Sequence, residues 1–356
     1  MNATVIVVHV IKDQDLPAGQ LKIEFNQKKN IADFIGYYNI IPSRFPFIAK
    51  IRAGWKYITA HRKILRLIKE KYGRPYIVHI QIAWSAGLIG LWLKFFFGWK
   101  YVLSEHWSGY SRDMAENVFL YPSIKKSLVK LILRNASVCM PVSDDLGRLM
   151  QAFESKTRYK PVSNVVDTRY FFPNPEMKFS KFRFIHASMM GPEKNVPAII
   201  RAIYSLSKKR NDFELYLVGP ENEDLINYCK ELAIYNIVVF FTGLKDYAGV
   251  SLEMQKSQAL ISFSIYETQS CVILESLCCG IPVIAAAVGG ITELITTENG
   301  ILVDKGDEDQ LLKATDKMIN EFARFERLKI AEAARERFSY ETIGKEFIKL
   351  YDQVIK

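Results

Sequence analysis

Two glutamates, Glu267 and Glu275, stand eight positions apart, and their spacing suggests a site for an anion and for hydroxyl groups. Glu267 follows a predicted strand, and Glu275 lies about one turn inside a helix predicted to begin near Cys271. The first turn of a helix offers free N–H groups and a positive dipole end, which suit a phosphate or diphosphate. Carboxylates on both sides suit the hydroxyls of a sugar and a ribose. Glutamates near a helix start also stabilise the dipole, so the residues alone leave both interpretations open.

Strand-like and helix-like segments alternate along the chain and must position these glutamates. Strands are predicted at 4–10 and 75–81, helices at 47–71 and 84–97, and a second alternating series begins at 182–188. This order predicts an α/β protein with mostly parallel, doubly wound sheets covered on both faces. Ligands of such sheets bind beyond the carboxyl ends of the strands, and between two domains the cleft is the expected site.

The length of 356 residues allows two domains, each with its own core. Prolines and asparagines between 161 and 176 indicate a linker. We therefore predict an N-terminal domain at 1–172, a C-terminal domain at 173–335, and a final helix at 336–356.

Positive charge is concentrated in the first half of the chain. Residues 1–175 contain 26 Lys and Arg against 12 Asp and Glu, a net charge of +14, within a total of +10. This asymmetry favours a negatively charged partner, such as anionic lipid or a phosphorylated substrate. Because no DNA- or RNA-binding signature is present, we expect no nucleic acid among the partners.

The five cysteines form no CxxC pair, which is typical of reduced, structural thiols in a cytosolic protein. The five histidines are scattered, so we expect no metal site.

No signal peptide opens the chain, and the longest apolar stretch, 86–99, contains Lys94. A membrane span needs about 20 apolar residues, so we expect a buried helix there and a cytoplasmic location.

The predicted helix at 47–71 is strongly basic. Together with Arg74 just beyond it, the helix carries nine Lys and Arg residues against Glu70 alone. Four apolar residues at helical spacing form a stripe that we expect to pack on the sheet: Ile48, Ile51, Trp55 and Ile58. The basic face is then either merely solvated or meets anionic lipid. In the second case we expect peripheral, salt-sensitive binding to the inner face of the cytoplasmic membrane, without insertion.

The run YETQSCVILESLCCGIPVIAAAVGGITELI resembles the donor-binding motif of the retaining GT-B glycosyltransferases of family 4. That family has Glu, seven residues, Glu, then a Pro-Val strand and a Gly-Gly-x-x-Glu turn. Further segments resemble family motifs in the family's order, from about residue 4 to the end: EHWSGY, SVCMPVSDDL, SNVVDTRYFFP, GPEKN, LYLVGPENEDL, VVFFTGL and FSYETIGKEFIKLYDQVI. The resemblance implies two Rossmann-like domains facing a central cleft, with a C-terminal helix that crosses back to the first domain.

The resemblance also implies roles for single residues. Glu267 would bind the transferred sugar, Glu275 the donor ribose, and Lys194 the diphosphate leaving group, while His106 would lie over the donor sugar. Donor contacts are further expected from residues within the matched motifs: Ser270, Cys271, Val272, Gly219 and Asn164. A lysine and a helix N-terminus can stabilise a diphosphate, so no metal or cofactor is expected, and the donor is a UDP- or GDP-linked sugar.

The chain departs from the family pattern at several places. Met189 stands where members usually have an arginine, so Arg148 or Arg183 would have to supply the second cation. Thr268, Gln269 and Ser270 replace a Gly-Phe-Gly sequence. The chain also resembles the family only from its second strand onward, without the usual first strand, Gly-rich loop and first helix.

These observations predict transfer of a sugar, with retention, to a glycan or lipid-linked acceptor in cell-envelope polysaccharide synthesis. The departures keep a second interpretation open, in which the chain is an inactive, binding-only remnant. A GT-B sugar-nucleotide epimerase shares the two-domain cleft and is a third. A dinucleotide oxidoreductase is disfavoured, because no Gly-x-Gly-x-x-Gly follows a strand.

Overall fold

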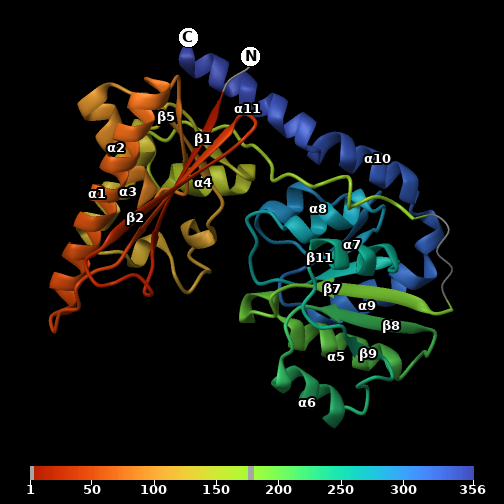
Figure 1. Ribbon diagram of the computed structural model, residues 1–356. Helices are drawn as coiled ribbons and strands as arrows, with labels where there is room; N and C mark the ends of the chain where they lie inside the picture. Colours follow the sequence, from red (N-terminus) through yellow and green to blue (C-terminus); the bar gives the residue numbers. More distant parts are fainter. Residues whose placement is uncertain (1–3, 175–179) are drawn as a thin grey trace. The chain divides into compact units, whose positions relative to one another are not determined.

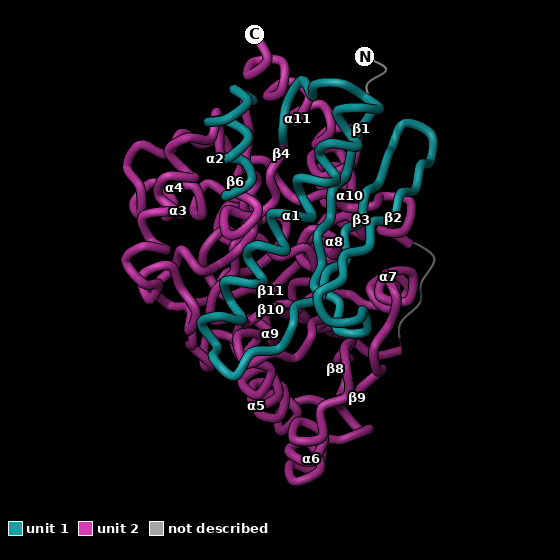
Figure 2. The backbone as a smooth tube through the Cα atoms, turned by 60° about the vertical axis from the view of Figure 1, so that its left-hand side comes forward, with its two compact units in different colours: residues 1–78, 88–99 teal, residues 79–87, 100–356 magenta. Residues whose placement is uncertain are grey.

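A computed structural model describes residues 4–174 and 180–356, and its chain divides into two compact units (Figure 2). Unit 1 comprises residues up to Val78 together with Leu88–Trp99, and unit 2 comprises His79–Gly87 and Lys100–Lys356. The predicted linker lies within unit 2, and its residues 175 and 176 lie outside the described residues. The domain boundaries expected from the sequence stay a prediction.

Unit 1 contains a three-stranded sheet covered by a long helix. Strands β1 (Val5–Lys12), β3 (Ile31–Tyr38) and β2 (Leu21–Lys28) lie in the order β1-β3-β2, and α1 (Pro46–Tyr72) packs on them (Figure 1). β1 and β3 are parallel, whereas β2 and β3 are antiparallel. Only two residues separate β2 from β3, and a parallel crossover needs a dozen or more. The expectation of mostly parallel sheets therefore does not hold for this hairpin.

The packing of α1 corrects one prediction from the sequence. The four residues expected to pack on the sheet are 38–67% exposed: Ile48, Ile51, Trp55 and Ile58. The residues of α1 that are buried come later in the helix: Ala60, His61, Ile64 and Ile68. At about 100° per residue, these two sets lie on different faces of the helix. The apolar periodicity was therefore real, but it did not mark the face that packs.

Helix α2 (Ala86–Phe97) confirms a helix in the longest apolar stretch, but this helix is only partly buried, since Phe95, Phe96 and Phe97 are 62%, 76% and 44% exposed. Its residues Ile89 and Leu93 are buried in a small cluster with Trp99. No helix in 4–174 or 180–356 combines the length and apolarity needed to cross a bilayer.

Unit 2 begins with a second three-stranded sheet, in the order β4-β5-β6 (β4, Val78–Gln81; β5, Tyr101–Glu105; β6, Cys139–Pro141). Helices α3 (Ser123–Asn135) and α4 (Asp144–Phe153) flank β6 in the sequence. Ser143 caps α4 by accepting a hydrogen bond from the Leu146 N–H.

The C-terminal helix α11 (Tyr340–Ile355) returns to this sheet region. Tyr351 Oη lies 2.7 Å from Nδ1 of His79 on β4, and Lys100 donates to the Val354 carbonyl at 2.7 Å. The helix follows α10 (Arg327–Phe338), which packs on α8 (Cys271–Cys278). The last helix thus crosses from the C-terminal half back to residues of the N-terminal half, as the resemblance implied.

The main sheet of unit 2 is six-stranded, with the order β12-β11-β10-β7-β8-β9. All five strand pairs are parallel. The strands are β7 (Phe182–Ala187), β8 (Phe213–Val218), β9 (Val239–Phe241), β10 (Ala259–Ser262), β11 (Val283–Ala286) and β12 (Gly300–Val303). The intervening helices are α5 (Val196–Ser207), α6 (Glu223–Glu231), α7 (Tyr247–Gln255), α8 and α9 (Glu308–Asn320). This is the doubly wound arrangement predicted from the sequence.

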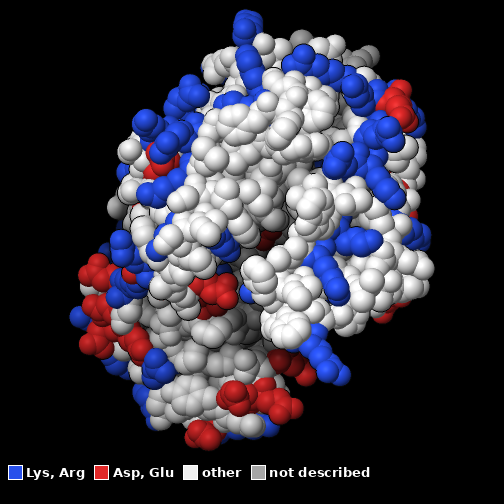
Figure 3. All heavy atoms as spheres, turned by 90° about the vertical axis from the view of Figure 1, so that its left-hand side faces the viewer, with Lys and Arg blue, Asp and Glu red and all other residues white. Residues whose placement is uncertain are grey.

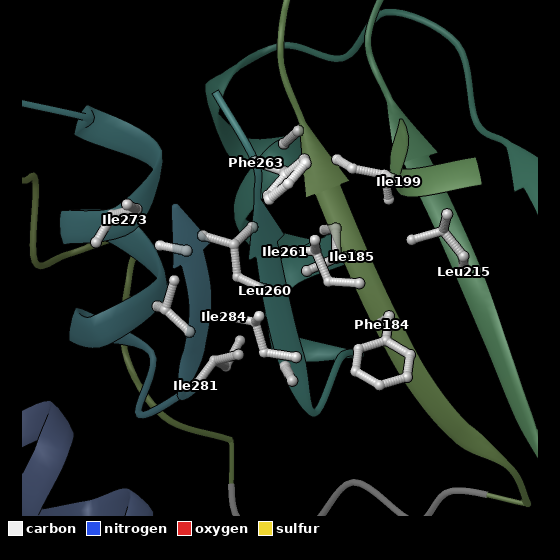
Figure 4. Packing of buried hydrophobic residues seen from close by; sticks show 14 of the residues in the cluster. Phe184, Ile185, Ile199, Leu215, Leu260, Ile261, Phe263, Ile273, Ile281 and Ile284 are labelled. Carbon is white, nitrogen blue, oxygen red and sulfur yellow. The ribbon is translucent and has the colours of Figure 1, made fainter. Parts of the chain in front are cut away.

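The core of this sheet is continuous and apolar. Phe184, Leu260 and Ile284 come from the adjacent strands β7, β10 and β11, and Ile273 comes from α8 (Figure 4). These four side chains are fully buried. Strands buried on both faces have near-continuous apolar sequences, as these do. The sheet therefore provides a rigid base for the loops that leave its carboxyl edge.

Candidate active site

Lys194 and Glu267 form an ion pair at the carboxyl edge of the six-stranded sheet. Lys194 ends the short turn Pro192–Lys194 after β7, and Glu267 lies in the loop after β10, the strand next to β7. Lys194 Nζ is 2.5 Å from Glu267 Oε1, and Ser264 Oγ donates to the same oxygen at 3.0 Å. The two charged side chains are 24% and 12% exposed. Two predicted catalytic groups are thus brought together and neutralise each other's charge.

The loop around Lys194 turns through a residue in a left-handed conformation. Asn195 has φ of 51°, in the left-handed region, where asparagine is among the few residues other than glycine that are common. Asn195 can therefore hold the turn that directly follows Lys194. Met189, at the position of the family's arginine, is 69% exposed.

The two arginines considered as replacements for that missing cation have other partners. Arg183 lies near the amino end of β7, about 13 Å along the strand from its carboxyl end, and forms an ion pair with Glu253. The suggestion that Arg183 reaches the diphosphate is therefore wrong. Arg148 lies on α4 and donates to Asp144 at 2.6 Å. Among the described residues, Lys194 is the cation that pairs with Glu267.

Glu275 is buried in a different environment from Glu267. It is the fifth residue of α8, it is 9% exposed, and the Tyr247 hydroxyl hydrogen-bonds its carboxylate. Burial raises the pKa of Glu275 to about 7, and the bond from Tyr247 partly opposes this rise. A buried carboxylate with such a pKa is typical of a functional site.

The N-terminus of α8 lies between the two glutamates. Ser270 is its N-cap residue, and the Ser270 side chain makes no capping hydrogen bond. The Ser270 carbonyl accepts the N–H groups of Ile273 and Leu274, so the orphan amides of this first turn are those of Cys271 and Val272. These N–H groups suit a diphosphate oxygen.

His106 is tied to the Glu267 loop through its backbone. The Thr268 hydroxyl donates to the His106 carbonyl at 3.1 Å. His106 Nε2 lies 3.1 Å from Gln81 Oε1, and since an amide oxygen only accepts, this contact assigns the proton to Nε2. The imidazole is exposed, so a sugar can approach it.

A hydrogen-bonded chain connects Gln81 to the C-terminal helix. Gln81 Nε2 lies 3.3 Å from His79 Nε2, and His79 Nδ1 lies 2.7 Å from Tyr351 Oη. Burial lowers the pKa of His79 to about 4, which keeps the ring neutral at pH 7. A neutral ring can accept at Nε2 and donate at Nδ1, so the chain from Tyr351 to His106 is consistent throughout.

Glu105, fully buried at the end of β5, holds the backbone next to His106. Its carboxylate accepts the N–H groups of Ala83, His106 and Trp107, each at 3.0 Å. Burial raises the pKa of Glu105, and these three hydrogen bonds oppose the rise. Glu105 thereby fixes the loops after β4 and β5 relative to each other.

Asn164 is joined to the Glu267 loop by Gln269. The Gln269 side-chain oxygen accepts the Asn164 N–H at 2.7 Å and the Ser163 hydroxyl at 3.1 Å. Thr268 and Gln269, which depart from the family's Gly-Phe-Gly, therefore attach the predicted residues His106 and Asn164 to the glutamate motif.

The Gly-Gly pair after β11 packs against the backbone of the Glu267 loop. A Cβ on Gly289 would lie 2.0 Å from the Glu267 carbonyl oxygen, and one on Gly290 would lie 2.0 Å from that of Thr268. The Gly290 N–H donates to the Glu267 carbonyl at 3.1 Å. Only glycine permits this approach, which holds the loop in place.

Two further residues of the matched motifs lie at helix or strand ends. The Glu293 carboxylate accepts the N–H groups of Asp144 and Asp145, at 3.0 and 2.7 Å, and so caps α4. Gly219 directly follows β8 and lies against the carbonyl of Ser188, which a Cβ would approach to 2.1 Å. A contact between Gly219 and the donor stays a prediction, as do the other donor contacts.

The sequence alone did not reveal the roles of Gln81, Glu105, Thr268 and Gln269. Each acts through a partner 22 to 162 residues away in the chain. A glutamate at the end of a fully buried strand, as Glu105 is, was the signal available, because a buried carboxylate needs several donors.

Two family models match the chain. The model "Glycosyltransferase Family 4" matches residues 6–170, and "Glycosyl transferases group 1" matches residues 171–337. The chain belongs to the family 4 glycosyltransferases. This confirms the resemblance that the motifs indicated.

Individual relatives of this family 4 glycosyltransferase are distant. It is 25% identical, over 238 residues, to the alpha-monoglucosyldiacylglycerol synthase of Streptococcus pneumoniae. The match covers 62% of this chain and 54% of that enzyme, so the chain spans about half the length of this relative.

Solved structures with a similar fold cover nearly the whole chain. Sucrose-phosphate synthase from Thermosynechococcus elongatus has a TM-score of 0.77 at 18% identity, over 99% of this chain and 89% of that one. HepE of Anabaena in complex with UDP has a TM-score of 0.71 at 18% identity, over 90% and 86% of the two chains. These likenesses confirm the predicted GT-B fold.

Proposed function

We propose that this chain transfers a sugar from a nucleotide-sugar donor to a glycan or lipid-linked acceptor, with retention of the anomeric configuration. The observation that carries the proposal is the Lys194–Glu267 pair beside the N-terminus of α8, with Glu275 buried one turn further along. Membership of family 4 supports the reaction class.

In the proposed reaction, the bond between the anomeric carbon and the diphosphate oxygen breaks. An acceptor hydroxyl forms the new glycosidic bond on the same face of the sugar, and its proton passes to the departing diphosphate. The products are the glycoside and the nucleoside diphosphate. Negative charge grows on the diphosphate during this step, so groups that stabilise that charge lower the barrier.

Lys194 and the N–H groups of Cys271 and Val272 would stabilise the leaving diphosphate. As Lys194 turns to the phosphate, Glu267 becomes free to accept hydrogen bonds from the transferred sugar. Glu275 would accept the ribose hydroxyls, and His106 would contact the sugar from the loop after β5. A lysine and a helix N-terminus supply the charge, and we expect no metal to be needed.

The acceptor and the location are inferred from charge. The net charge of +14 over residues 1–175 favours peripheral contact with the anionic inner face of the cytoplasmic membrane, where a lipid-linked acceptor would lie. The S. pneumoniae relative is named as a synthase of alpha-monoglucosyldiacylglycerol, and this name supports a lipid acceptor. Cell-envelope polysaccharide synthesis would be the setting.

The test begins with a thermal-shift screen of UDP- and GDP-linked sugars. A donor at 100 times its dissociation constant adds about 2.7 kcal/mol of stability. Donors that bind are then incubated with diacylglycerol and glycan acceptors, and NMR of the product gives the anomeric configuration. Glu275→Gln serves as the matched variant, with weakened donor binding.

The outcomes separate the alternatives. Release of the nucleoside diphosphate with a retained glycoside supports the proposal. A donor that is epimerised but not consumed indicates an epimerase, and donor binding without turnover indicates a binding-only protein. Failure of every UDP- and GDP-linked sugar to stabilise the chain would overturn the assignment of the donor site.

A further inference from the structure

The N-terminal half of α1 exposes large apolar side chains. Its stripe, Ile48, Ile51, Trp55 and Ile58, is 38%, 44%, 67% and 43% exposed. Two aromatic residues adjoin the stripe at the helix start, Phe45 and Phe47, which are 67% and 73% exposed. Single exposed apolar residues are ordinary, but a contiguous set of this size marks an interaction surface.

The orientation of the stripe explains why the sheet does not cover it. At about 100° per residue, the stripe is centred roughly 135° around the helix from the buried residues Ile64 and Ile68. Those two residues pack with Ala32 and Phe34 of β3. The stripe therefore faces away from the sheet.

The same outward face becomes basic in the second half of α1. Arg62, Arg66 and Lys69 continue the angular positions of the stripe, and all three are exposed. Lys63 lies beside this face, as does Glu70, the acidic residue of the helix. On the side of α1 and α2, Lys and Arg side chains surround uncharged surface (Figure 3). One face thus combines an apolar first half with a basic second half.

We propose that α1 is an interfacial membrane anchor that inserts its stripe into an anionic bilayer. The helix lies along the surface, with the sheet on its far side. The stripe enters the boundary between headgroups and acyl chains, about 5–10 Å deep, while Arg62, Arg66 and Lys69 contact anionic headgroups. Trp55 is a residue type that favours this boundary. The partner of this face is a lipid surface, because its apolar half matches the acyl chains of a leaflet and its basic half matches the anionic headgroups.

This inference rests on the membrane contact of the proposed function. It differs in how the protein binds the membrane, by insertion of the stripe rather than by electrostatic contact alone. Vesicles of phosphatidylcholine alone, and of phosphatidylcholine with an equal amount of phosphatidylglycerol, are the probes. Binding is measured by co-sedimentation, and the environment of Trp55 by the difference in fluorescence between wild type and Trp55→Phe. We expect anionic vesicles to shift this difference to the blue and brominated lipid to quench it.

The decisive variant is Ile51→Ser/Trp55→Ser, with Ile237→Ser/Leu244→Ser as a matched control. The control residues are 62% and 66% exposed and lie in the C-terminal half of the chain. We expect the stripe variant to bind anionic vesicles at least tenfold more weakly and the control to bind like wild type. Arg62→Gln/Arg66→Gln should weaken binding at low salt and leave the residual binding less salt-dependent.

Three results would overturn insertion. Equal binding by the stripe variant would leave electrostatic contact alone, and equal binding of wild type to neutral vesicles would refute the anionic partner. A dimer in vesicle-free solution that the stripe substitutions dissociate would make the stripe an interface between copies. Donor binding, followed by thermal shift in the same samples, separates failure of this inference from failure of the proposed function.

Discussion

The two glutamates of the donor motif lie in contrasting regions. Glu267 stands in a loop and shares its charge with Lys194 and the Ser264 hydroxyl. Glu275 lies inside α8, where its described hydrogen bond comes from the neutral Tyr247 hydroxyl. One carboxylate is compensated by a cation, and the other is buried in a way that raises its pKa to about 7.

This difference shows how one motif can divide two tasks. A carboxylate that is ion-paired with a lysine can release the lysine when a phosphate binds. We therefore expect Lys194 and Glu267 to act together at the bond between the sugar and the diphosphate. A buried carboxylate without a cation gains most from ribose hydroxyls, which supply the donors that water no longer provides. We therefore expect Glu267 and Lys194 to affect turnover, and Glu275 to affect binding and pH dependence.

Replacing Lys194 by alanine should have the largest effect. The variant loses one positive donor to the leaving diphosphate, which costs roughly 10²–10³ in kcat. Steady-state kinetics with a saturating donor measures the loss. Lys181→Ala, which removes the ion pair of Lys181 with Glu214, is the control and should keep its kcat. Equal kcat values for the two variants would break the assignment of the leaving-group role.

Replacing Glu275 by glutamine tests the other half of the comparison. The folded-state pKa of about 7 lies above the usual value, so the contribution of this residue to stability is complete below about pH 4.5 and is lost as the pH rises through 7. Between pH 5 and pH 9, the free energy of unfolding of the wild type should fall by about 3 kcal/mol more than that of Glu275→Gln. Donor affinity of the variant should fall about tenfold or more, since hydrogen bonds to a charged group contribute about 1.5–3 kcal/mol.

Urea unfolding at the two pH values measures this difference in stability. Glu346→Gln, at an exposed position of α11, is the matched control and should follow wild type. Identical pH dependence in Glu275→Gln and wild type would show that burial does not perturb this carboxyl.

The sequence predicted the glutamate pair, the helices at 47–71 and 84–97 and the alternation of strands and helices, because each leaves a local signal of motif or periodicity. It failed at the stripe of α1, since periodicity shows that residues share a face but not whether that face packs. It also missed Thr268 and Gln81, whose partners at position 106 are 162 and 25 residues away. Contacts of this kind depend on how loops from different strands meet, and no spacing in the chain reports them.

A smaller effect is expected for Tyr247→Phe. The hydroxyl lowers the pKa of Glu275, so its loss should raise that pKa above 7 and cost about 1 kcal/mol of stability at pH 9, but little at pH 5. The phenylalanine keeps the ring contact with Phe171, whose centroid is 4.8 Å away. Tyr170→Phe, on a neighbouring ring, is the control. An equal loss at both pH values would mean that the hydroxyl acts through packing rather than through Glu275.

The smallest effect is expected for Gln81→Leu, which alters the orientation of the His106 imidazole near the Glu267 loop. Gln81 accepts from His106 Nε2 at 3.1 Å, and this contact and the backbone bond from Thr268 orient the imidazole near the Glu267 loop. Gln81→Leu removes the side-chain contact and leaves the backbone bond, so we expect kcat to fall about threefold, the cost of one ordinary hydrogen bond. Because Gln81 positions another residue, kinetics alone is not enough.

The ¹⁵N shifts of the His106 ring report which nitrogen carries the proton, and Gln81→Leu should shift the ring away from the Nε2–H form. Tyr351→Phe, two bonds further along the chain, should change these shifts less. If the tautomer and kcat of Gln81→Leu both match wild type, His106 is held by its backbone alone, and the two sides of the site act independently.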